Sequence, residues 1–156
     1  MTVVRHIPYV NRLGKLIQVP GGKRIEEALK EARSNLDEIA EQCLGEIDQS
    51  IRAVQGAASA SDRTPESFDA VYAASNHVVG LAGLFGRPDL GTAAHSLCEL
   101  LDRSGSWEEC SPVALKVHVD SLALLRDPHL LSAEERANIL DGLVKVVART
   151  TRTAAA

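Results

Sequence analysis

Aromatic side chains are scarce in this chain of 156 residues, making up 3% of it, whereas the hydrophobic fraction is an ordinary 45%. The volume of any core must therefore come from leucine, valine, isoleucine and alanine. This composition favours packed helices over an aromatic-rich β-sandwich. The length is sufficient for a single domain with a core of its own.

Positive net charge and long apolar runs are also absent. The formal charge is −4 at pH 7, which provides no electrostatic basis for binding nucleic acid. No apolar run reaches membrane-spanning length, and the first residues lack the layout of a signal peptide, so we expect no membrane partner and a cytoplasmic location. The three cysteines are odd in number and form no C-x-x-C pair, as expected for reduced thiols: Cys43, Cys98 and Cys110.

The usual signatures of catalytic and metal sites are missing. The five histidines form neither H-x-x-x-H nor H-E-x-x-H, so we expect no metal site. Neither a G-x-S-x-G elbow nor a phosphate-binding G-x-x-x-x-G-K-[ST] loop is present. We therefore expect no cofactor and no self-contained enzyme active site.

Apolar residues at spacings of three and four predict five amphipathic helices. The first begins at Arg24 and ends near Gly56. Each of the other four helices begins at a helix-start signal. In chain order these signals are Thr64-Pro65, Asp89, Ser111-Pro112, and Ser132 with Glu135. Short connections and no convincing strand predict an all-α, up-and-down helical bundle.

Three segments follow from this pattern. Residues 1–23 are broken by proline and glycine and are predicted to form an extended N-terminal arm, which either packs on the body or docks elsewhere; packing is favoured because exposed apolar arms are a liability. Residues 24–150 form the predicted bundle. Residues 151–156 are predicted to be a frayed tail.

The second predicted helix has three faces. One points to the bundle: Phe68, Val71, Tyr72, Ser75, Val79 and Ala82. One flank carries mostly small residues: Asp69, Ala73, Asn76, Gly80, Gly83 and Arg87. His77, Leu81 and Leu84 are expected nearly opposite the core.

The glycines on the small-residue flank need a physical reason, because each glycine inside a helix costs about 1 kcal/mol relative to alanine. Either a partner docks closely there, or the third helix or the arm packs tightly against it. Leu81 and Leu84 likewise need cover, from another element such as the arm or from a partner.

Residues 75–86 read SNHVVGLAGLFG. They resemble the signature of histidine phosphotransfer (HPt) domains, A-H-x-x-K-G-x-x-G-x-F-G. Gly80, Gly83, Phe85 and Gly86 fall in register, while Asn76 takes the position of the reactive histidine and Val79 that of the lysine. The resemblance extends to the following helix, through residues 94–101, and more weakly to residues 117–122 and 140–149.

The resemblance implies a four-helix bundle with an extra helix, working in bacterial two-component signalling. It implies docking of a response-regulator receiver domain, with a sensor histidine kinase as a further partner. The expected contact residues are Ala73, Asn76, His77, Gly80, Gly83, Leu84 and Arg87. The amide of Asn76 is not nucleophilic, and Val79 cannot balance phosphate charge, so we expect receiver binding without ordinary phosphotransfer.

Two alternatives remain open at this point. In the first alternative, the chain is an active phosphoryl carrier that uses His77. This histidine lies one residue after the acceptor position and about 100° around the helix. Alternatively, it is a helical interaction or dimerisation module outside phosphorelay signalling, acting through Leu81 and Leu84 or through the arm. The oligomeric state is open in each case.

Overall fold

The computed structural model describes residues 14, 21–60, 63–127 and 129–153. The predicted arm before residue 21 lies outside the described residues, apart from Gly14. The chain divides into two compact units, residues 1–38 and 39–156. Every secondary-structure element with bounds in the described residues is an α-helix, which confirms the all-α prediction: α2 (Ile25–Ser59), α3 (Pro65–Ala82), α4 (Pro88–Ser104), α5 (Pro112–Leu125) and α6 (Ala133–Thr153).

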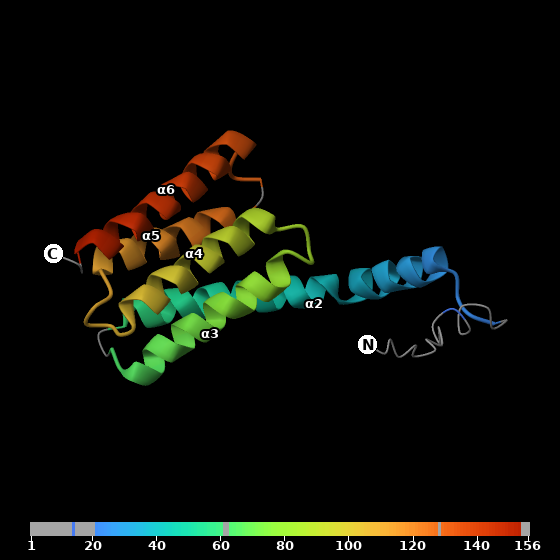
Figure 1. Ribbon diagram of the computed structural model, residues 1–156, viewed down its shortest axis with the longest axis horizontal. Coiled ribbons are helices and arrows are strands. Elements are labelled where there is room, and N and C mark those ends of the chain that lie inside the picture. Colours follow the sequence, from blue (N-terminus) through green and yellow to red (C-terminus); the bar gives the residue numbers. More distant parts are fainter. Residues whose placement is uncertain (1–13, 15–20, 61–62, 128, 154–156) are drawn as a thin grey trace, which may run out of the picture. The chain divides into compact units, whose positions relative to one another are not determined.

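The second unit is a helical bundle in which α3, α4, α5 and α6 run in alternating directions (Figure 1). Helix α4 is the central element, because it packs against α3, α5 and α6. Eight of its residues are buried: Leu90, Ala93, Ala94, Ser96, Leu97, Cys98, Leu100 and Leu101. The C-terminal part of α2 contributes Ile47, Ile51 and Val54 to the same core.

The predicted start signals are confirmed for three helices. Thr64 caps α3 in a capping box with Ser67, and Pro65 is the first helical residue. Ser111 accepts a hydrogen bond from the Ala114 backbone at the start of α5. At the start of α6 the Ser132 hydroxyl accepts from the Glu135 N–H, and the Glu135 carboxylate accepts from the Ser132 N–H.

The start of α4 differs from the prediction. The residue at its N-cap position is Arg87 rather than Asp89, and no side chain caps it. Asp89 lies in the first turn instead, and its carboxylate is 3.2 Å from Nε of Arg136 on α6. A negative charge is favourable at this position because of the helix dipole, so Asp89 supports the helix start without capping it.

Helix α3 is also shorter than predicted. It ends at Ala82, and residues 83–86 form turns rather than its last helical turn. Gly86 has φ +70°, a conformation that strains other residues, and the Arg87 N–H then donates to the Ala82 carbonyl at 2.8 Å. The chain therefore reverses here, with Gly83 outside the helix.

The inward face of α3 is displaced by one residue from the prediction in its second half. Val78 is fully buried, whereas Val79 and Tyr72 are only partly buried. The buried positions Phe68, Val71, Ser75, Val78 and Ala82 follow a spacing of 3-4-3-4, which is the repeat of a helix that packs along a narrow seam. None of the helices in the described residues combines the length and apolarity needed to cross a bilayer.

Candidate docking surface on helix α3

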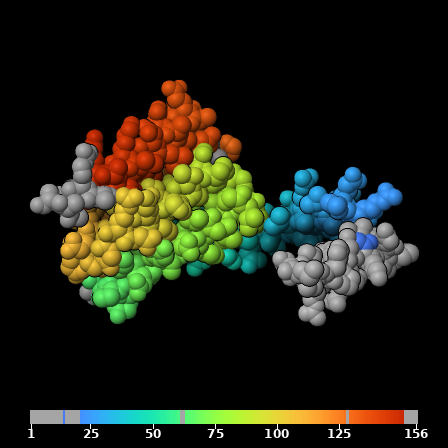
Figure 2. Space-filling view, viewed as in Figure 1, coloured from blue at the N-terminus to red at the C-terminus, as the bar shows by residue number. Residues whose placement is uncertain are grey.

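The beginning of α3 is held in place by the loop between α4 and α5. Trp107 is 5% exposed, and its indole N–H donates to the Thr64 carbonyl (3.0 Å) and to the Ser67 hydroxyl (2.8 Å). Its ring meets Phe68 edge to face, with centroids 5.2 Å apart. These contacts give α3 a defined position at the surface of the bundle, where it forms part of the face seen in Figure 2.

The small-residue flank of α3 is open. Ala73, Asn76, Gly80 and Gly83 are all exposed, and a Cβ atom added at either glycine would meet no described atom within 4 Å. The close approach between α3 and α4 occurs instead at Gly91, whose added Cβ would lie 3.4 Å from the Cβ of Ala82. Packing by α4 therefore does not explain Gly80 and Gly83.

His77 faces α2, contrary to the expectation that it projects opposite the core. Its Nδ1 lies 3.2 Å from the hydroxyl of Ser50, and its Nε2 lies 3.8 Å from Oε2 of Glu46. Ser50 is buried, whereas His77 and Glu46 are about half exposed. Glu46 and Ser50 are four residues apart on α2, so they share one face of that helix.

This arrangement disfavours phosphoryl acceptance by His77. Both ring nitrogens have a polar neighbour, and the neighbour of Nε2 carries negative charge. An incoming phosphoryl group would bring further negative charge to within a few ångströms of the Glu46 carboxylate, which is repulsive. Neighbouring Asn76 has no such charged partner among the described residues, but its amide cannot act as a nucleophile.

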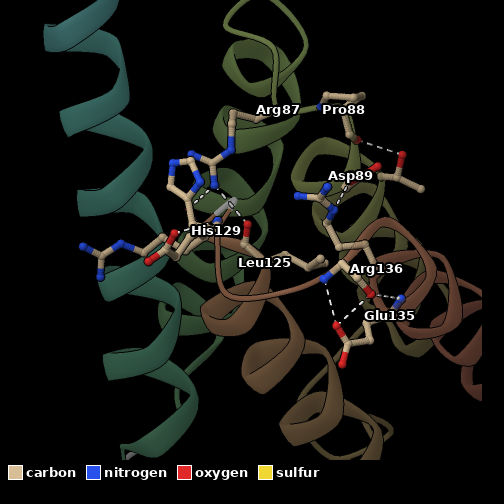
Figure 3. A network of polar contacts seen from close by, with 11 residues as sticks. Arg87, Pro88, Asp89, Leu125, His129, Glu135 and Arg136 are labelled. Carbon is tan, nitrogen blue, oxygen red and sulfur yellow. Dashed lines mark hydrogen bonds and ion pairs between the residues drawn. The ribbon is translucent and has the colours of Figure 1, made fainter.

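Arg87 lies apart from this flank and is tied to α5. Its guanidinium donates to the carbonyl of Leu125 at 3.0 Å and also to the carbonyl of Arg126, and Figure 3 shows it reaching the end of α5. The last carbonyls of a helix have no partner within the helix, so Arg87 satisfies two of them. This capping role was not foreseen from the sequence, because it depends on a residue 38 positions away.

The two leucines assigned to the outer side of α3 have different environments. Leu81 is partly buried and packs against the hydrophobic core, so its expected position opposite the core was wrong. Leu84, in the turn after α3, is 61% exposed. It extends the open flank beyond Gly83 with one apolar side chain.

The two buried cysteines, Cys98 and Cys110, are poor candidates for an alternative nucleophile. Burial, with the nearby Asp102 carboxylate, raises the pKa of the Cys98 thiol to about 11. Burial likewise raises the pKa of Cys110. Both thiols therefore stay protonated at neutral pH, and a thiol is a far weaker nucleophile than a thiolate.

His118 of α5 is fully buried, which the sequence did not reveal. Its Nδ1–H donates to the Ala114 carbonyl at 2.8 Å, and its Nε2 accepts from the Ser96 hydroxyl of α4 at 3.1 Å. Burial lowers the pKa of His118. The neutral imidazole is thus a link between α4 and α5 rather than a catalytic group.

Within the described residues no three histidine, cysteine or acidic side chains are grouped so that they could hold a metal ion. In comparisons with family models, with curated proteins and with solved structures, nothing matches this chain.

Proposed function

We propose that this protein is HPt-like and docks a response-regulator receiver domain on the open flank of α3 without accepting its phosphoryl group in the ordinary way. The observation that carries the proposal is the unoccupied space above Gly80, which stands in register with the HPt motif. A glycine in a helical turn with no packing reason within the described residues is costly, and close approach by a partner backbone supplies a reason.

The chemistry on this surface supports binding over transfer. Asn76 stands where the reactive histidine of the family stands, and its side chain offers amide donors to a phosphoryl oxygen but no nucleophile. Val79, at the lysine position, adds no charge. Bound in this way, the protein would compete with active carriers for the receiver or act as a scaffold.

The alternative of an active carrier using His77 is disfavoured by Glu46. The carboxylate lies 3.8 Å from Nε2 of His77, on the side of the ring that faces α2. A receiver docked on the flank of Asn76 would approach from a direction about 100° away around the helix.

The decisive experiment restores the missing nucleophile. Receiver domains encoded by the source genome are phosphorylated with a small phosphodonor and incubated with wild type, Asn76→His and His77→Ala. We expect acid-labile label on Asn76→His only, because this residue alone lies in the acceptor register on the open flank. Label on wild type that disappears in His77→Ala would contradict the proposal and establish the carrier.

A binding measurement covers the case in which no label is transferred. Titration calorimetry with the same receivers is expected to show saturable binding that Gly80→Gln weakens at least about tenfold, or about 1.4 kcal/mol. Gly142→Gln in α6 is the matched control, because a Cβ there also meets no atom within 4 Å. Equal binding by wild type and Gly80→Gln, or no binding by wild type, would refute docking at this flank.

A further inference from the structure

The N-terminal part of α2 carries an apolar stripe that the described residues leave uncovered. Ile25 is 80% exposed and Leu29 is 54% exposed, although both are large aliphatic side chains. Ala32 is exposed and Leu36 is partly exposed. All the buried residues of α2 lie in its C-terminal half, from Ile47 onward. Because most helical stability in proteins comes from packing of an apolar face, an apolar partner for the stripe would stabilise the N-terminal part.

The spacing of the stripe is that of a two-stranded coiled coil. Ile25, Leu29, Ala32 and Leu36 follow one another at intervals of four, three and four residues, the alternation of core positions in a heptad repeat. Charged residues lie on the outer side of the helix: Glu27, Lys30, Glu31 and Asp37. A second helix with the same pattern would bury the stripe and leave these charges in water.

Two further charges flank the stripe itself. Glu26 and Arg33 each follow a core position, seven residues apart, and therefore lie on the same edge of the stripe. Neither makes an ion pair with a described residue, whereas neighbouring Lys23 and Glu31 pair with each other. The edge thus offers one negative and one positive charge, neither paired within the part of the chain that the structure describes.

We propose that a second copy of this chain packs antiparallel on this stripe along residues 25–36. In that two-fold arrangement Ile25 lies opposite Leu36 of the second copy, and Leu29 lies opposite its Ala32. Glu26 of each copy then faces Arg33 of the other, forming two equivalent ion pairs at an interface in which both chains use the same surface.

Charge complementarity selects both the occupant and its direction. In a parallel pair the same two side chains would face Gly21 and Ala28 of the second copy, and no ion pair would form. The stripe is self-complementary only when one copy is reversed. This inference is independent of the proposed receiver binding, because it concerns α2 alone.

The test is sedimentation equilibrium of the full chain across two orders of magnitude in protein concentration, since the overlap of about 18 Å predicts a weak dimer. The average mass is expected to rise from 16.7 kDa towards twice that value. Glu26→Arg and Arg33→Glu should each raise the dissociation constant about tenfold, because each turns two attractive pairs into repulsive ones. The double variant, which exchanges the two charges, should restore association.

A matched pair of leucines controls for general loss of apolar surface. Leu29→Gln should weaken association, whereas Leu124→Gln on α5, where the side chain is 47% exposed, should not. A monomer at all concentrations would overturn the proposal, as would a dimer indifferent to both charge reversals. If the protein is monomeric and Leu29→Gln lowers its free energy of unfolding, the proposal is also overturned. In that case a segment of the same chain covers the stripe.

Discussion

Gly80 lies in the last turn of α3, on the exposed flank of that helix, where an added methyl group would stabilise the helix. The backbone there is helical, and an added Cβ would meet no described atom within 4 Å. Glycine has more conformational freedom in the unfolded chain than alanine and loses it on folding. Among the described residues, no packing contact at Gly80 compensates for this loss.

We predict that Gly80→Ala raises the free energy of unfolding by about 0.5–1 kcal/mol, the usual gain for this change in a helix. Urea denaturation followed by circular dichroism measures it. Gly86→Ala is the contrasting variant, since φ there is +70° and alanine would be strained, so stability should fall. A loss of stability in Gly80→Ala would show that an element of this chain does occupy the flank.

At the scale of single elements, the end of α5 depends on a side chain from a distant turn. The guanidinium of Arg87 donates hydrogen bonds to the carbonyls of Leu125 and Arg126. At the end of a helix such carbonyls accept no hydrogen bond from within the helix. Figure 3 shows the second long-range contact of this region, between Arg136 of α6 and Asp89 of α4. Together the two arginines connect the turn before α4 to α5 and α4 to α6.

We predict that Arg87→Met lowers the free energy of unfolding by about 1 kcal/mol, because it removes the donor to the part-buried carbonyl of Leu125 and to the exposed carbonyl of Arg126 while keeping the aliphatic stem. Thermal denaturation checks this, and Arg87→Lys should recover part of the loss. If Arg87→Met is as stable as wild type, water satisfies both carbonyls and the cap is dispensable.

The sequence predicted helices well where a local signal exists and less well where tertiary packing decides. Thr64, Ser111 and Ser132 could be recognised as helix starts because each acts on a backbone N–H three residues away. The end of α3 and the start of α4 were misplaced, because they depend on the positive φ of Gly86 and on a chain reversal. The orientation of His77 was wrong because Ser50 and Glu46, its neighbours, lie on another helix.

The whole bundle is expected to be sensitive to mild acid through His118. The imidazole is fully buried between α4 and α5 and is neutral, with its pKa held below 6.5 by burial. The unfolded chain binds a proton at this residue near pH 6.5, and the folded chain resists doing so. Stability is therefore fully present above about pH 6.5 and falls as the pH decreases below it, by up to about 1.4 kcal/mol per pH unit.

We predict that His118→Gln flattens the pH dependence of the melting temperature between about pH 5 and 7, relative to wild type. His95→Gln is the control, because His95 is an exposed histidine of α4. Carboxylates with lowered pKa values, such as Glu66 and Glu135, take up protons at lower pH. They should therefore not contribute to the pH dependence of the melting temperature between about pH 5 and 7. An unaltered slope in His118→Gln would exclude His118 as the source.

Trp107 is the sole tryptophan of the chain, and it lies where the α4–α5 loop meets the start of α3. Its indole is shielded from solvent and lies beneath the guanidinium of Arg63, at 5.1 Å. Intrinsic fluorescence excited at the indole band therefore reports a single location, without any label. A red shift of its emission would signal that the loop has separated from α3, which makes this residue a built-in optical probe for the unfolding measurements above.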